Sequence, residues 1–264
     1  MTSMTSEEHY RGFQITYYSE HVPASLFIEK MLRAPILQNV GRGGIRILDV
    51  EGNKLVCRKY FHGGLFRVFT RDVFITGERA TQEAEIMLHL KDSGFPVITP
   101  FATITEVGTL MKRLYLCTFM EEGAVSLLEH LKRSEKKVRL RAIKRFAELL
   151  WRLEQAGVYH PDLHLRNVVL TGDGRMLFLD FDKALRKPIA QKDVESMFWR
   201  LARYVAKMER QGALPVYPYE KMLFVRVYER LSKRPLVETL QKQMKTKNLL
   251  HRIGWFFESL LYRA

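Results

Sequence analysis

Residues 160–167 read His-Pro-Asp-Leu-His-Leu-Arg-Asn, and residues 177–182 read Leu-Phe-Leu-Asp-Phe-Asp. The first stretch offers a carboxylate, Asp162, and an amide, Asn167, while the second places another carboxylate, Asp180, after an apolar run. Phosphoryl transfer needs such a set, because one Asp accepts the proton of the attacking hydroxyl while Asn and a second Asp hold Mg²⁺ against nucleotide phosphates. The spacing Asp-x-x-x-x-Asn and the triplet Asp-Phe-Asp match two kinase motifs. The two stretches therefore predict a kinase that uses ATP and Mg²⁺.

A strand–turn–strand segment separates the two stretches. Residues 168–170 and 176–179 are apolar, and Thr-Gly-Asp-Gly at 171–174 is typical of a hairpin turn. Kinases carry such a hairpin between the two motifs, so it supports the same prediction. The alternatives are that the polar residues only form turns, or that His160 and His164 bind a metal with the Asp between them.

The composition is that of an ordinary globular protein with a large excess of positive charge. The 264 residues are 47% hydrophobic and carry a formal net charge of +14, which favours polyanions such as nucleic acid, anionic lipid headgroups or phosphorylated sugars. No zinc-finger, RNA-recognition or helix-turn-helix signature is present, so we expect no nucleic-acid partner. There is no apolar run of about 20 residues and no signal-peptide core, which predicts a chain on the cytoplasmic side.

The chain has two cysteines, Cys57 and Cys117, each inside an apolar, strand-like run. Their number and spacing fit neither a disulfide framework nor a zinc site. We therefore expect two small core residues with free thiols in a reducing compartment.

Upstream, a glycine cluster opens a strand–turn–strand segment. Gly41, Gly43 and Gly44 precede an apolar run, and this position predicts a flap whose backbone N–H groups approach nucleotide phosphates. The alternative is a plain turn.

A cation should follow on the second strand and reach the α- and β-phosphates. The candidates are Arg58 and Lys59, which point to opposite faces of a strand, so only one can point inward. The sequence alone leaves this choice open. Glu83 lies on a predicted helix over residues 76–90 and is the expected partner of the strand cation.

The downstream half reads as mainly helical. Residues 119–124 resemble a hinge that could hold an adenine ring, and residues 191–210 carry an apolar stripe at helical spacing that we assign to the core. The amphipathic segment 249–263 is either a packed terminal helix or a helix lying in a membrane interface.

Two protein-kinase features are missing. Pro161 stands where protein kinases usually have Arg before the catalytic Asp, and no long activation segment or Ala-Pro-Glu sequence follows Asp182. A peptide substrate therefore has no obvious platform, which favours a small molecule or a glycolipid as acceptor.

Six motifs together resemble the bacterial lipopolysaccharide kinases, most of all the 3-deoxy-D-manno-octulosonic acid (Kdo) kinases, over about residues 40 to 205. They are Gly-Arg-Gly-Gly (41–44), Cys-Arg-Lys-Tyr followed by Gly-Gly-Leu (57–65), Arg79 through Glu83, Gly-Phe-Pro-Val (94–97), His-Pro-Asp-Leu-His-Leu-Arg-Asn (160–167) and Asp-Phe-Asp-Lys (180–183). The last sixty residues match poorly.

The resemblance implies an α+β, protein-kinase-like fold with two lobes. A polar tail is expected at 1–12, an N-lobe with a small antiparallel sheet and one main helix at 13–121, and a mostly helical C-lobe at 122–264.

The resemblance also implies ATP-dependent phosphorylation of the Kdo 4-hydroxyl on a lipid A precursor at the cytoplasmic face of the inner membrane. Asp162 would be the base, Asn167 and Asp180 would hold Mg²⁺, and Glu83 would pair with the strand cation. The family pattern favours Arg58 for that cation, although Lys59 follows it directly. Competing hypotheses are a heptose kinase of the lipopolysaccharide core, a minimal protein kinase, and a kinase-like binding module without activity.

Overall fold

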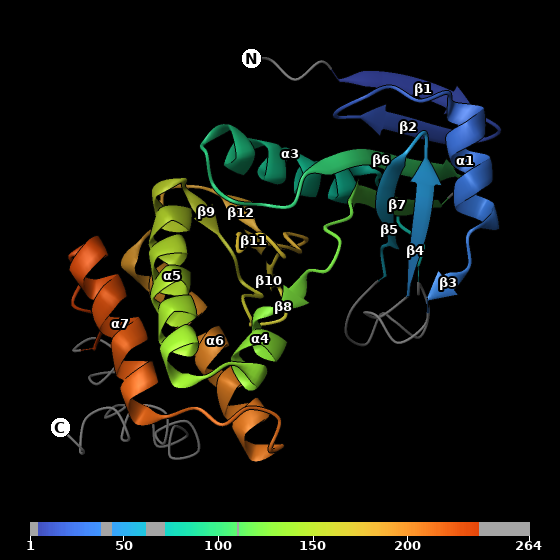
Figure 1. Cartoon of the computed structure of the whole chain (residues 1–264). Helices are drawn as coiled ribbons and strands as arrows, with labels where there is room; N and C mark the ends of the chain where they lie inside the picture. Colours follow the sequence, from blue (N-terminus) through green and yellow to red (C-terminus); the bar gives the residue numbers. More distant parts are fainter. Residues whose placement is uncertain (1–4, 38–43, 62–71, 110, 238–264) are drawn as a thin grey trace. The chain divides into compact units, whose positions relative to one another are not determined.

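The computed structural model describes residues 5–37, 44–61, 72–109 and 111–237, as two compact units. One comprises Met1–Lys91 and Ile98–Glu121, and the other comprises Asp92–Val97 and Glu122–Ala264. The first unit is an antiparallel sheet with two helices and the second is mainly helical, which confirms the predicted α+β fold class (Figure 1). The predicted flap residues Gly41 and Gly43 and the segment 249–263 lie outside the described residues.

The sheet of the first unit has seven strands in the order β1-β2-β6-β7-β5-β4-β3, and all neighbours are antiparallel. The strands are β1 (Ser6–Tyr10), β2 (Phe13–Tyr17), β3 (Ile36–Leu37), β4 (Ile45–Val50), β5 (Asn53–Lys59), β6 (Pro100–Val107) and β7 (Lys112–Phe119). The two helices that the structure describes in this unit are α1 (Ala24–Arg33) and α3 (Glu78–Asp92).

Helix α1 covers one face of this sheet. Its apolar stripe includes Phe27, Ile28 and Met31, which belong to the same buried cluster as Leu55 and Cys57 of β5. Because successive strand residues point to opposite faces, the β5 residue that follows Cys57 points away from α1. By the same alternation, Arg58 points away from α1, whereas Lys59 points to the same face of the sheet as Cys57.

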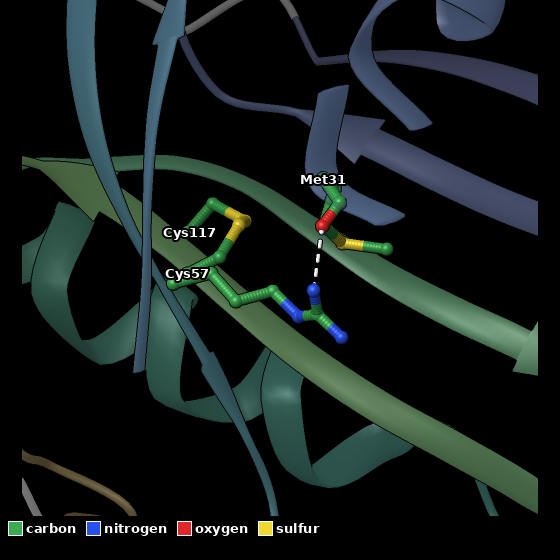
Figure 2. The surroundings of a disulfide bond; sticks show 4 residues. Met31, Cys57 and Cys117 are labelled. Atoms are coloured by element: carbon green, nitrogen blue, oxygen red, sulfur yellow. Dashed lines mark hydrogen bonds between the residues drawn. A yellow bond between two sulfur atoms is a disulfide. The ribbon is translucent and has the colours of Figure 1, made fainter. Parts of the chain in front are cut away.

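The expectation of two free thiols is wrong, because Cys57 and Cys117 are joined in a disulfide (Figure 2). They occupy directly opposed positions on β5 and β7, with their Cα atoms 4.1 Å apart. Opposed residues on neighbouring strands lie close enough for their sulfur atoms to meet. The two cysteines are 60 residues apart in the sequence, and the strand register that brings them together cannot be obtained from that spacing.

The expectation of a loose polar tail over residues 1–12 also needs correction, because Ser6–Tyr10 forms strand β1. A two-residue turn with positive φ at Arg11 (46°) and Gly12 (82°) returns the chain into β2. Glu8 in β1 accepts a hydrogen bond from the backbone N–H of Ala24 (2.8 Å) at the start of α1. The backbone of this segment therefore pairs with β2, and the Glu8 side chain binds the first residue of α1.

The second unit is built mainly from helices around an aromatic core. Its helices are α4 (Leu127–Arg133), α5 (Lys136–Gln155), α6 (Gln191–Arg210) and α7 (Pro218–Ser232); its short strands are β8 (Val125–Ser126), β9 (Val158–Tyr159), β10 (Val168–Leu170), β11 (Met176–Phe178) and β12 (Leu185–Arg186). Phe146 of α5 stacks on Phe224 of α7 at 5.3 Å, and Phe198 of α6 contacts Tyr228 of α7 at 4.8 Å between ring centroids. The apolar stripe of α6 is therefore core, as predicted.

Residues Asp92–Val97 belong to the second unit, although the expected N-lobe at 13–121 included them. The ring of Phe95 packs on Phe178 at 5.1 Å, and the N–H of Phe178 donates to the carbonyl of Pro96 (3.1 Å). The carbonyl of Gly94 accepts from Arg152 of α5 (2.6 Å). These contacts attach the segment to the β10–β11 hairpin and to α5, which lie on either side of the predicted catalytic loop in the sequence.

A buried ion pair between α5 and α7 yields the largest expected effect on stability. Arg139 donates through Nε and Nη2 to the two oxygens of Glu220 (2.7 Å each), and the two side chains are only 7% and 1% exposed. Replacing Arg139 with Met leaves a buried carboxylate unpaired, so we expect the free energy of unfolding to fall by about 3–5 kcal/mol in urea titrations.

The exposed pair Arg145–Glu148 on the same helix provides the control for this prediction. Arg145→Ala should change the free energy of unfolding by less than about 1 kcal/mol, because exposed pairs are hydrated and contribute little. Equal losses in Arg139→Met and Arg145→Ala would contradict the prediction.

Candidate active site

The loop 160–167 is held in shape by its own hydrogen bonds and by two buried leucines. The side-chain Nδ2 of Asn167 donates to the backbone carbonyl of Asp162 (3.1 Å), and the N–H of Asn167 donates to the carbonyl of His164 (2.9 Å). Leu163 and Leu165 point into the core and are 0% and 4% exposed. The two anchored leucines thus help to fix the backbone between Asp162 and Asn167.

The structure brings the third predicted residue to this loop. Strand β11 pairs with β10, and the N–H of Leu179 donates to the carbonyl of Asn167 (2.8 Å), which places Asp180 directly after a residue bonded to the loop. The ring of Phe181 packs on His160 at 5.1 Å. Asp180 itself adopts a left-handed backbone with φ 60°, an uncommon conformation for a residue other than glycine and one that is found at functional sites.

An arginine distant in sequence pairs with the predicted base. Arg200 of α6 donates to Oδ1 of Asp162 through Nε (2.8 Å) and also through Nη2. Partial burial alone would raise the pKa of Asp162, but the hydrogen bonds and charge of Arg200 outweigh it, and the net pKa lies below the usual value. The carboxylate is therefore ionised at neutral pH, as a proton acceptor must be.

The two histidines of the loop are structural and uncharged. Burial lowers the pKa of His160 to about 4, and burial also lowers the pKa of His164. The ring of His164 stacks on Tyr204 of α6 at 4.8 Å. Within the described residues, no group of three or more His, Cys, Asp or Glu side chains could hold a metal, so these histidines are not grouped as a metal site.

The donor set of Asn167 and Asp180 does fit Mg²⁺. Nδ2 of Asn167 is engaged by the Asp162 carbonyl, so its Oδ1 is the atom available to a cation, and Asp180 supplies a carboxylate. Mg²⁺ prefers oxygen ligands and is usually held by only one or two protein groups together with substrate phosphates and water. Two oxygen-bearing residues without a larger acidic cluster match that pattern.

In the first unit, the two adjacent cations turn to different partners. Nη2 of Arg58 donates to both oxygens of Glu83 on α3 (2.8 and 2.7 Å), whereas Lys59 pairs with Asp72. Glu83 is 2% exposed and also accepts from the hydroxyl of Tyr60. The predicted pairing of Glu83 with a strand cation is thus found at Arg58, the position that the resemblance favoured.

Gly44 is the one flap glycine within the described residues. It has φ 72°, and a Cβ atom at this position would lie 2.5 Å from Cγ2 of Ile36 and 2.9 Å from the carbonyl oxygen of Leu37. The close approach of β3 therefore requires glycine here whether or not a phosphate binds.

Sequence reasoning missed Arg200 and Tyr60. Arg200 lies 38 residues from Asp162 on a helix identified only by its core stripe, so no spacing rule connects the two. Tyr60 directly follows the two candidate cations, but the expected partner of those cations, Glu83, gave no sign in the sequence that it is buried and accepts from a hydroxyl.

Comparison with known proteins identifies related kinases. A sequence model of the "Lipopolysaccharide kinase (Kdo/WaaP) family" matches residues 30–228. A 3-deoxy-D-manno-octulosonic acid kinase of Xylella fastidiosa (strain 9a5c) is 30% identical over 187 residues, which cover 69% of this chain and 74% of that protein. A protein of the same name from Xanthomonas oryzae pv. oryzae (strain PXO99A) is 28% identical over 196 residues, covering 72% of this chain and 78% of the relative.

Proposed function

Because the chain belongs to the lipopolysaccharide kinase (Kdo/WaaP) family, we propose that it transfers the γ-phosphoryl group of ATP to the 4-hydroxyl of Kdo on a lipid A precursor. Membership makes the chain a kinase that phosphorylates a sugar hydroxyl; the acceptor position and the residue roles are the proposal. The observation that carries it is the joining of Asp162, Asn167 and Asp180 by the hydrogen bonds of one loop and one hairpin.

Asp162 acts as the base in this proposal. Its carboxylate is kept ionised by Arg200 and takes the proton of the sugar hydroxyl as the new oxygen–phosphorus bond forms. The bond between the γ-phosphorus and the leaving oxygen of ADP breaks in the same displacement. Because the loop backbone is fixed by Asn167, the carboxylate is positioned before the acceptor binds.

Asn167 and Asp180 would hold Mg²⁺, which neutralises charge on the ATP phosphates. Arg58 is the residue of the first unit that would contact those phosphates, with Glu83 orienting its guanidinium. The close approach of β3 explains the glycine at position 44 without a phosphate contact. The proposal that Gly41, Gly43 and Gly44 form a flap over the phosphates is therefore supported only by the order of the motifs along the chain.

The acceptor class is supported by charge. A net charge of +14 favours a phosphorylated glycolipid that lies among anionic headgroups. None of the described helices is both long enough and apolar enough to span a bilayer. We therefore propose that the protein acts from the cytoplasmic face of the inner membrane by binding to its surface.

The test of this function is phosphoryl transfer from ATP to defined acceptors by the purified chain with Mg²⁺. We expect phosphate on the Kdo-bearing lipid A precursor and none on the same lipid without Kdo. Transfer only to a heptosylated acceptor would replace this proposal with a heptose kinase, and transfer only to protein would replace it with a protein kinase.

Removal of a magnesium ligand should change the dependence on the metal. For Asp180→Asn we expect the Mg²⁺ concentration at half-maximal activity to rise by about 10-fold to 100-fold, the range seen when groups that organise a metal site are lost. Activity titrations with MgCl₂ at saturating ATP measure this shift. Asp173→Asn, on the exposed β10–β11 turn, is the control, and an equal shift in both variants would contradict the assignment.

A further inference from the structure

In the second unit, the side chain of Arg200 contacts the carboxylate of Asp162 asymmetrically. Both donors of the guanidinium, Nε and Nη2, bind the same oxygen, Oδ1. Within the described part of the chain, Oδ2 accepts no well-formed hydrogen bond. One oxygen of the carboxylate is therefore anchored, while the other can accept a bond from a ligand.

Arg200 is itself rigidly placed. Its neighbours Met197 and Leu201 on α6 are 0% and 5% exposed, which fixes the helix in the core. The sulfur of Met197 accepts from the backbone N–H of His160 (3.5 Å), and Tyr204 of α6 stacks on His164 at 4.8 Å. These two contacts join α6 to the catalytic loop on both sides of Asp162, so the loop and the arginine are held in one arrangement.

We propose that Arg200 is a positioning residue that holds Oδ1 of Asp162 so that Oδ2 receives the acceptor hydroxyl. The inference deepens the proposed function and rests on Asp162 being its base. Catalysis of phosphoryl transfer depends mainly on positioning, because the protein does little covalent chemistry in the loose transition state. A carboxylate with one anchored oxygen keeps a fixed direction for the other.

Arg200 takes no proton in this step. The proton of the hydroxyl moves to Oδ2 of Asp162, the acceptor oxygen bonds to the γ-phosphorus, and ADP departs with the electrons of the broken bond. Arginine stays charged throughout, because the guanidinium is not deprotonated in proteins. Its part is to hold the carboxylate, so its loss should lower kcat and leave the KM for ATP little changed.

The experiment compares Arg200→Ala, Arg200→Lys and Arg203→Ala in steady-state phosphoryl transfer. We expect Arg200→Ala to lower kcat by about 10-fold to 100-fold, the range for a misplaced catalytic group, with the KM for ATP little changed. Arg200→Lys should restore only part of kcat, since lysine keeps the charge and lacks the fork.

Arg203→Ala is the matched control, because Arg203 is an exposed arginine three residues further along the same helix. It should retain the kcat and the KM for ATP of the unaltered protein. Wild-type kcat in Arg200→Ala would overturn the inference, as would a higher kcat. An equal kcat loss in Arg200→Ala and Arg203→Ala, or an Arg200→Lys protein no more active than Arg200→Ala, would also overturn it.

The proposed function and this inference fail in different ways. If the unaltered protein phosphorylates no lipopolysaccharide precursor, the proposed function fails, and the same variants are then compared by their acceptor-independent release of ADP from ATP. If the unaltered protein is active and Arg200→Ala matches it, only the inference fails. Thermal unfolding midpoints within a few degrees of each other ensure that the variants are compared as folded proteins.

Discussion

Replacing Asp162 with Asn lowers kcat for phosphoryl transfer by at least about 100-fold, the contribution expected of a general base. Asn has nearly the same size as Asp but cannot accept the proton of the attacking hydroxyl. Because Asp162 is only half-buried and its neighbours Leu163 and Leu165 hold the loop, we expect the thermal unfolding midpoint to change little. Steady-state kinetics with the acceptor at saturation, alongside thermal unfolding, measures both quantities.

The control for this prediction is Asp173→Asn, which removes a carboxylate from the exposed turn of the β10–β11 hairpin. We expect its kcat to stay within about twofold of the unaltered protein, as for an ordinary surface substitution. A fully active Asp162→Asn protein would show that another group accepts the proton.

The second prediction compares the loss of Arg58 with the loss of Lys59 by their effects on kcat/KM for ATP. Arg58→Ala should lower kcat/KM for ATP by about 100-fold, because we propose that Arg58 contacts the ATP phosphates while Glu83 holds its guanidinium. Lys59→Ala should change kcat/KM by less than about fivefold, since Lys59 pairs with Asp72 in a partly exposed contact of the kind that contributes little. The two variants serve as controls for each other, because each removes one cation from the same strand.

The free energy of unfolding of Arg58→Ala should be measured alongside its activity. Arg58→Ala leaves the carboxylate of Glu83, which is 2% exposed, without its arginine donor, and we expect a loss of about 1–3 kcal/mol in the free energy of unfolding. Assays at a temperature well below the unfolding midpoint keep this loss from lowering activity. A large loss of kcat/KM in Lys59→Ala with a normal Arg58→Ala protein would reverse the assignment.

The proximity of Asp162, Asn167 and Asp180 could be predicted because these residues lie close together along the chain. Asp162 and Asn167 share one loop, and a short hairpin carries the chain back to Asp180, so local spacing was enough. The orientation of Arg58 and Lys59 was different. It depends on which face of β5 meets α1, and Cys57 in the core shows that face only once the sheet has formed.

Two of the errors and omissions involve contacts between distant segments. The disulfide between Cys57 and Cys117 follows from the register of β5 and β7, and the pairing of Arg200 with Asp162 follows from the packing of α6. The strand formed by Ser6–Tyr10 is a different case, because it pairs with its neighbour β2 in a local hairpin, although its polar composition alone predicts a tail.

We propose that this kinase phosphorylates the 4-hydroxyl of Kdo, and the decisive measurement is phosphorus and proton NMR of the product formed from ATP and a Kdo-bearing lipid A precursor, with Asp162→Asn run in parallel. We expect one new phosphomonoester whose phosphorus couples to the proton on carbon 4 of Kdo, absent from the variant. Phosphate on another sugar, or a product that persists undiminished in Asp162→Asn, would contradict it.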